Sequence, residues 1–132
     1  MANSVGFHES EKRLSPRTRD LHRALTSLQE ELEAIDWYQQ RIDAAHDDEL
    51  RDILRHARDE EIEHATMILE WIRRKSPEFD TTLRGRLFAP GAIVEREQAL
   101  EHGSAGGAGN GAEPRRPNHA PRVTVGTLRE GR

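Results

Sequence analysis

The chain has 132 residues, enough for one small domain, and only 34% of them are hydrophobic whereas 33% are charged. This apolar content is low for a monomer that must bury its own core, so we expect self-association. The net charge of −4 is spread over 24 acidic and 20 basic residues, which disfavours a nucleic-acid partner. The absence of cysteine excludes disulfides and thiolate metal sites, and no apolar run or signal pattern suggests a membrane or secretion route, so we expect a cytoplasmic protein.

The first part of the chain is a polar lead followed by one long helix. Residues 1–14 have no sustained apolar period, so we expect a flexible N-terminal lead. Ser15 and Pro16 have the pattern of a helix N-cap followed by proline at the first helical position. From there the apolar period predicts a helix that runs to about Ala44.

One face of this helix carries an apolar stripe with a polar interruption at Gln39. At the edge of the stripe, Glu31 and Tyr38 lie seven residues apart, where a side chain can reach into an interface. Glu31 is therefore a candidate metal ligand, although it also fits a solvated acidic run with Glu30 and Glu33. The stripe consists of Leu21, Leu25, Leu28, Leu32, Ile35 and Ile42.

A short connection at residues 46–48 leads into a second helix. Asp47 is expected to cap this helix, which should end in a basic last turn before a Ser-Pro stop. So short a link predicts an antiparallel hairpin. Glu31 lies sixteen residues before Asp47 and His64 lies seventeen after it, so both should lie at a similar height in the hairpin.

The second helix has polar residues in the middle of its apolar stripe. The two central positions are Glu61 and His64, and burying a carboxylate without a partner costs at least several kcal/mol. Their Glu-x-x-His spacing places both side chains on one helical face, within reach of a single metal ion. The alternative is that they form only a hydrogen-bonded or ionic pair with each other. The stripe positions are Leu50, Leu54, Ala57, Glu61, His64, Ile68 and Trp71.

The apolar periodicity becomes weaker after the second predicted helix. Residues 78–102 suggest a short helix, a break at Pro90 and Gly91, and one or two further turns, which we interpret as packing arms or oligomer contacts. The hairpin domain is thus expected to span residues 15–102. Residues 103–121 have the composition of a flexible linker. The segment 122–132 contains a compact apolar peptide suited to docking on another protein, or else is a frayed terminus.

One hairpin supplies half of a di-iron ligand set. Ferritin-like di-iron bundles use one Glu from each of two helices and Glu-x-x-His from each of the other two. A two-fold dimer would bring together Glu31, Glu61 and His64 from both copies. Such a hard, oxygen-rich set suits iron or manganese.

Three stretches of the chain resemble a known family. EELEAIDWY at residues 30–38, RDEEIEHA at 58–65 and LEWIRR at 69–74 are similar to the encapsulated ferritins, two-helix ferritin-like cargo proteins of bacterial encapsulin shells. The resemblance covers roughly residues 20–100. It implies an all-α fold in which an antiparallel two-helix hairpin plus a short C-terminal helix dimerises into a ferritin-like four-helix bundle.

The resemblance also implies a site. Glu31, Glu61 and His64 would be the ligands of one di-iron ferroxidase centre per dimer, and Tyr38 would join them as a catalytic residue. Trp37 would lie beside the centre, like Tyr38. An outer metal-attracting site would be formed by Glu30 and Glu33.

The assembly implied by the resemblance is a homo-oligomer, usually a ring-shaped decamer of five dimers. The segment from Val123 to Arg129 resembles an encapsulin targeting peptide of the LTVGSL type, with Val123 for the leading Leu and Thr127 for Ser. The expected partner is therefore the shell protein. The expected location is the inside of an encapsulin nanocompartment in the cytoplasm.

The function expected from these features is a ferroxidase that uses oxygen or peroxide and delivers iron for mineral storage inside the shell. The alternative is a non-catalytic, metal-stapled scaffold or iron-delivery cargo protein. A rubrerythrin-like peroxide reductase is disfavoured because no cysteine is present to hold its rubredoxin-type iron. A plain coiled-coil dimer would bind no metal.

Overall fold

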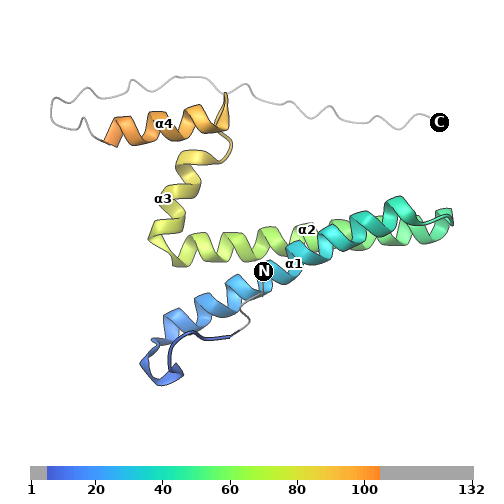
Figure 1. The fold of residues 1–132 in the computed structure, drawn as a ribbon, viewed down its shortest axis with the longest axis horizontal. Coiled ribbons are helices and arrows are strands. Elements are labelled where there is room, and N and C mark those ends of the chain that lie inside the picture. The colour runs from blue at the N-terminus through green and yellow to red at the C-terminus, as the bar shows by residue number, and fades with distance from the viewer. Residues whose placement is uncertain (1–5, 105–132) are drawn as a thin grey trace, which may run out of the picture.

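The computed structural model describes residues 6–104 of the chain, which form helices joined by short links, with no β-strand among them. The all-α fold class expected from the sequence is confirmed, and its main element is a pair of long antiparallel helices (Figure 1). The predicted targeting peptide and all but the first two residues of the predicted linker lie outside the described residues. The elements are η1 (Glu11–Arg13), α1 (Pro16–Ala44), α2 (Asp48–Lys75), α3 (Pro77–Arg86) and α4 (Ile93–Ser104).

The described part of the N-terminal lead contacts α1. The Phe7 and His22 rings lie 4.7 Å apart between centroids, and Arg19 lies 3.7 Å from Glu11 in the short helix η1. The lead therefore has local contacts that the sequence pattern did not indicate. The expectation that the lead is flexible stays a prediction, because a single static structure does not report on its motion.

The ends of the long helices are set by capping side chains. The Ser15 hydroxyl accepts a hydrogen bond from the Thr18 backbone N–H at 3.1 Å, and Pro16 follows at the first helical position. The Asp47 carboxylate accepts from the Leu50 N–H at 2.7 Å, so α2 begins directly after a three-residue link. These caps confirm the predicted helix starts.

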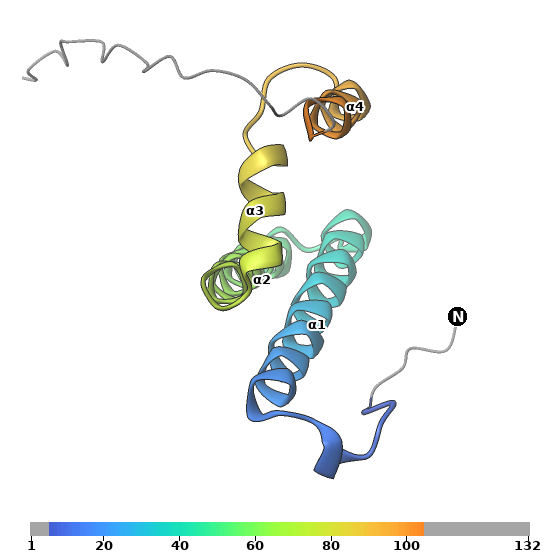
Figure 2. The same ribbon diagram turned by 90° about the vertical axis from the view of Figure 1, so that its left-hand side faces the viewer.

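The two long helices share a small core. Within residues 6–104 the buried apolar side chains are Ile42, Ala65 and Ile72, of which Ile72 is completely inaccessible to solvent. At the open end of the hairpin, the Arg17 guanidinium donates to the Lys75 carbonyl at 3.0 Å. Figure 2 shows α1 and α2 side by side when viewed along the molecule. The hairpin is thus held along its length by few buried contacts.

Much apolar surface of α2 remains uncovered in the single chain. Leu50, Ile53, Met67 and Trp71 are all exposed, and they recur at helical spacing on the face that also carries His64. An apolar stripe of this length on a helix is typical of an interface with another helix. Self-association stays a prediction, and this exposed face of α2 is the surface that it would use.

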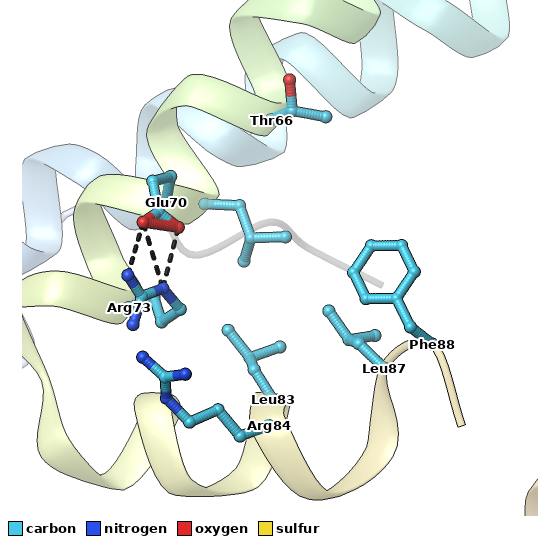
Figure 3. Close-up of a pocket in the computed structure, with 8 residues that line it drawn as sticks. Thr66, Glu70, Arg73, Leu83, Arg84, Leu87 and Phe88 are labelled. Carbon is cyan, nitrogen blue, oxygen red and sulfur yellow. Dashed lines mark hydrogen bonds and ion pairs between the residues drawn. The ribbon is translucent and has the colours of Figure 1, made fainter. Parts of the chain in front are cut away.

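A sharp joint separates α2 from α3. Ser76 is buried, ends α2 and caps α3 through the Phe79 N–H. Arg73 joins the two helices, because its guanidinium donates to both Glu70 in α2 and Asp80 in α3. A groove of about 560 Å³ lies in the angle (Figure 3) and is lined by Thr66, Leu69, Glu70, Arg73, Leu83, Arg84, Leu87 and Phe88.

The chain turns again between α3 and α4. Gly91 has a φ of 89°, a left-handed conformation that glycine adopts without steric cost. The predicted break at Pro90 and Gly91 is therefore the turn between two short helices. Phe88, at φ 56°, is fully exposed at the open side of the groove between α2 and α3. Across residues 6–104, no helix has both the length and the apolar character of a membrane span.

Candidate metal centre

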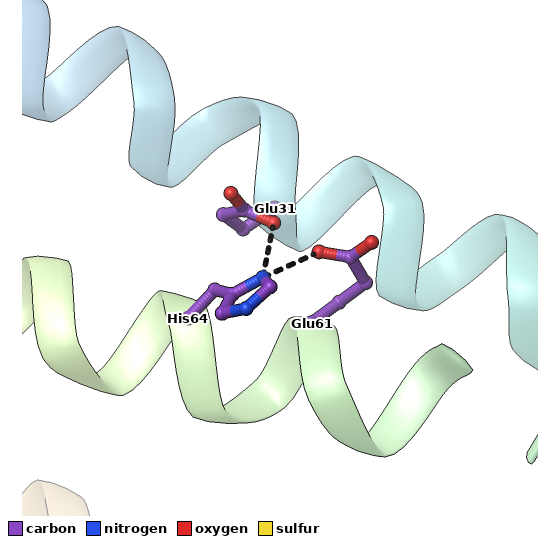
Figure 4. Close-up of side chains that lie close together, drawn as sticks. All are labelled: Glu31, Glu61 and His64. Carbon is purple, nitrogen blue, oxygen red and sulfur yellow. Dashed lines mark hydrogen bonds and ion pairs between the residues drawn. The ribbon is translucent and has the colours of Figure 1, made fainter. Parts of the chain in front are cut away.

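Three side chains from the two long helices converge at the middle of the hairpin (Figure 4). Glu31 comes from α1, and Glu61 and His64 come from successive turns of α2. The His64 Nδ1 lies 3.2 Å from Glu61 Oε2 and 3.9 Å from Glu31 Oε2. One ligand atom from each residue lies within 4.8 Å of the other two, which is close enough for all three to contact one metal ion.

The local sequence explains this convergence. Glu61 and His64 are three residues apart, so they point from the same face of α2. The three-residue link between Ala44 and Asp48 makes the helices antiparallel and sets their register. That register places Glu31 opposite the pair, as the similar distances along the chain from Asp47 predicted.

The two carboxyl groups interact strongly with each other. A hydrogen bond with Glu61 is the main cause that raises the pKa of Glu31, and partial burial raises that pKa further. The pKa of Glu61 is lowered because it accepts hydrogen bonds from Glu31 and from His64. The two pKa shifts therefore have opposite directions, and both arise mainly from the contact between the two carboxyl groups.

This donor set fits a hard divalent cation. Two carboxylate oxygens and an imidazole nitrogen are ligands that iron and manganese accept. The fold holds the two carboxyl groups and the imidazole close together, and a cation bound among them would offset the repulsion between the two carboxylates. Each glutamate side chain is 24% exposed and His64 is 49% exposed, so the cluster opens onto the surface and has room for ligands from elsewhere.

The other predicted site residues lie outside this three-residue cluster. Glu30 and Glu33 are exposed on α1, and Trp37 is half exposed. Tyr38 is partly buried, and the Arg41 guanidinium carbon lies 5.4 Å from the centre of its ring. Their roles beside the centre or in an outer site therefore stay proposals.

A contact near the cluster was not found from the sequence. The Arg58 guanidinium donates to the side-chain oxygen of Gln39 at 2.8 Å and so links α2 to α1, one turn away from Glu61. The only signal for it was Gln39 as a polar residue within the apolar stripe. Gln39 is exposed, so solvent could satisfy its amide, and the pattern did not indicate that Arg58 would be its partner.

Comparison with known proteins gives consistent results. The sequence model of the EncFtn-like family matches residues 6–90. A protein of Rhodospirillum rubrum described as an encapsulated ferritin-like protein is 49% identical over 112 residues, which cover 83% of this chain and 80% of that protein. A ferritin-like protein of Thermotoga maritima is 46% identical over 104 residues, covering 79% and 91%.

A more distant relative and a solved structure agree with these matches. The encapsulin nanocompartment cargo protein EncC of Myxococcus xanthus is 32% identical over 134 residues, covering 98% of this chain and 99% of that protein. A crystal structure of a Nitrosomonas europaea protein is 55% identical, with a TM-score of 0.65, and covers 67% of this chain and 98% of the other. The chain therefore belongs to the EncFtn-like family of encapsulated ferritin-like proteins.

Proposed function

We propose that the protein is a ferroxidase that oxidises Fe²⁺ to Fe³⁺ at a di-iron centre shared between two copies of the chain. The observation that carries this proposal is the convergence of Glu31, Glu61 and His64 on the hairpin. Each chain supplies half of the ligands that ferritin-like di-iron bundles use, and the cluster is partly open to solvent.

The exposed face of α2 supports a dimer as the complete site. Leu50, Ile53, Met67 and Trp71 form an apolar stripe, and His64 lies among them. Two copies that pack this face about a two-fold axis exclude water from the stripe and bring both clusters to the same place. The assembled centre then has four carboxylates and two imidazoles, as in a four-helix bundle with two metals.

Iron is the substrate in this reaction. The carboxylates of Glu31 and Glu61 provide the negative charge that holds two Fe²⁺ ions, and His64 provides a nitrogen ligand on each side. Each ion gives up one electron. Dioxygen takes up two electrons and two protons to leave as hydrogen peroxide, or hydrogen peroxide takes up the same to leave as water.

Residues around the cluster have supporting roles in the proposal. Tyr38 and Trp37 lie on the α1 segment that follows Glu31, and we assign them to the wall of the dimer centre. Glu30 and Glu33 are exposed carboxylates on either side of Glu31 and would attract Fe²⁺ from solution.

The assembly belongs to the same proposal. The names of two relatives describe encapsulated or encapsulin cargo proteins, which supports the shell protein as a partner of the segment from Val123 to Arg129. Oxidised iron would then be stored as mineral inside the shell, because a helical hairpin dimer has no storage cavity of its own. The proposed assembly is a ring of five dimers, in which the outer arms supply contacts between dimers. Their exposed apolar side chains offer a surface for such contacts, and these are Leu87, Phe88, Ile93 and Val94.

The test is anaerobic addition of Fe²⁺ followed by native mass spectrometry and then exposure to air. Two iron ions per dimer, bound together with dimer formation and oxidised faster than in buffer, are expected. Replacing Glu61 or His64 by alanine should abolish that oxidation. Metal binding without oxidation above the buffer rate would instead indicate a metal-stapled scaffold, and full oxidation by the alanine variants would refute the site.

A further inference from the structure

Arg58 is held by two residues on the side of the hairpin. Its guanidinium donates to Asp59 Oδ1 through Nε at 2.9 Å and through Nη2 at 2.7 Å, and to Gln39 Oε1 through Nη1 at 2.8 Å. The Gln39 amide nitrogen donates to Asp43 at 3.2 Å, which turns the amide oxygen toward Arg58. The Arg58 side chain is 26% exposed, so it lies against the hairpin rather than in open solvent.

Three other arginines of α2 form ion pairs with a carboxylate one turn earlier in the same helix. Arg51 pairs with Asp48, Arg55 with Asp52 and Arg73 with Glu70, in each case with a carboxylate three residues earlier. The residue three positions before Arg58 is Arg55, and the residue four positions before it is Leu54. Arg58 therefore has no such partner.

Among the residues three or four positions from Arg58 along α2, the one with a carboxylate is Glu61, one turn later. A guanidinium that paired with Glu61 would occupy the oxygen atoms that a metal ion needs, because carboxylates bind arginine through both oxygens. In the structure Arg58 is instead directed to Gln39 and Asp59, and Glu61 contacts Glu31 and His64.

We propose that Gln39 and Asp59 are positioning residues for the metal centre, because they hold the Arg58 guanidinium away from Glu61 and so keep this carboxylate free for a cation. The inference rests on the proposed role of Glu61 as a metal ligand. It gives a role to the contact between Gln39 on α1 and Arg58 on α2. It also explains how an arginine is tolerated one turn from a cation site.

The test is a mutant cycle in which Mn²⁺ binding is measured by isothermal titration calorimetry. Four full-length proteins are compared: the wild type, Arg58→Met, the double variant Gln39→Met with Asp59→Asn, and the triple variant that combines all three changes. In the double variant both acceptors are weakened or lost, Arg58 moves to Glu61, and the Mn²⁺ dissociation constant rises. An exposed ion pair of this kind corresponds to a change of up to about fivefold.

The diagnostic quantity is the effect of removing Arg58 in the two backgrounds. Loss of its charge by itself strengthens Mn²⁺ binding slightly at long range, and this effect is the same in both backgrounds. We expect a change of less than about twofold in the wild type and about fivefold in the double variant, where Arg58 competes for Glu61. Equal changes in both backgrounds would overturn the inference.

Two controls separate this result from other failures. Gln39→Glu keeps an acceptor for Arg58 and should bind Mn²⁺ at least as tightly as the wild type, whereas weaker binding would count against the inference. If the wild type and Glu61→Ala bind Mn²⁺ equally, the proposed metal site itself is wrong. If only Glu61→Ala loses binding and the cycle shows no coupling, the site stands and the positioning role fails. Circular dichroism of each variant reports whether the helices remain.

Discussion

Replacing Glu61 by glutamine should separate metal binding from folding. In the metal-free protein, Glu61 lies against Glu31 and His64, with ligand atoms within 4.8 Å of one another. If both carboxylates were charged, they would repel by about 3 kcal/mol at an effective dielectric constant of about 20, and exposure to solvent makes the real repulsion smaller. Glutamine removes one of these charges and keeps the shape and a hydrogen-bonding oxygen. Glutamine also weakens the favourable contact with His64, and this loss opposes the gain from reduced repulsion. The metal-free Glu61→Gln variant should therefore have a free energy of unfolding within about 1 kcal/mol of the wild type.

The same substitution should remove the stabilisation by metal. A cation present at about 100 times its dissociation constant stabilises the folded protein by about 2.7 kcal/mol. For a domain of this size that corresponds to a rise in Tm of roughly 10 °C or more. We expect thermal unfolding, followed by circular dichroism with and without Mn²⁺, to show this rise in the wild type and not in Glu61→Gln.

A matched control lies next to this residue. Glu60 is an exposed carboxylate that pairs with His56 outside the cluster, so Glu60→Gln removes the same charge from the same turn of α2. This variant should keep most of the Mn²⁺-induced rise in Tm. An equal rise in Glu61→Gln and the wild type, or an equal loss in both glutamine variants, would show that the cluster is not the metal site.

Further predictions concern the core, the α2–α3 joint and the tail. Ile72→Ala removes a completely buried side chain and should lower the free energy of unfolding by about 2–5 kcal/mol in denaturant titrations, and a loss below about 1 kcal/mol would contradict its place in the core. Hydrogen bonds from Arg73, and then Arg74, lower the pKa of Glu70 from 4.5 to about 2, so this contact contributes stability that is complete above about pH 4.5 and is lost as the pH falls toward 2. The Tm of the wild type should thus fall more steeply over this range than that of Arg73→Met, and parallel curves would contradict this. Deletion of residues 122–132 should leave iron oxidation unchanged and prevent loading into an encapsulin shell, whereas normal loading of the shortened chain would refute the targeting role.

The ends of the helices could be predicted because they depend on neighbouring residues. Ser15 and Asp47 cap the helices that follow them, as predicted, and each cap joins a side chain to a backbone N–H three residues later. Such interactions need no information about the rest of the fold. The helical hairpin could be predicted for the same reason, since a link of three residues is long enough only to connect two antiparallel neighbouring helices.

The ligand cluster was also accessible from the sequence. Glu61 and His64 interrupt an apolar stripe at a spacing that places them on one face, and the short link sets the height of Glu31 beside them. What the pattern left open was the choice between an internal polar pair and a metal site. Only the structure showed the Glu31 carboxyl in hydrogen-bonding contact with Glu61, which raises the pKa of Glu31 and gives the cluster its third possible metal ligand.

Contacts between residues that are distant in the chain could not be predicted from the sequence. No local pattern states that Arg58 binds Gln39, that Phe7 lies against His22, or that Arg73 joins α2 to α3. A long arginine side chain has several carboxylates within reach, and its choice among them depends on how the helices pack. The sequence by itself thus determined the helices, their caps and the candidate ligands, because these follow from periodicity and near neighbours. The tertiary structure decided which ligands converge and which charges are kept apart, because these follow from the packing of one helix against another.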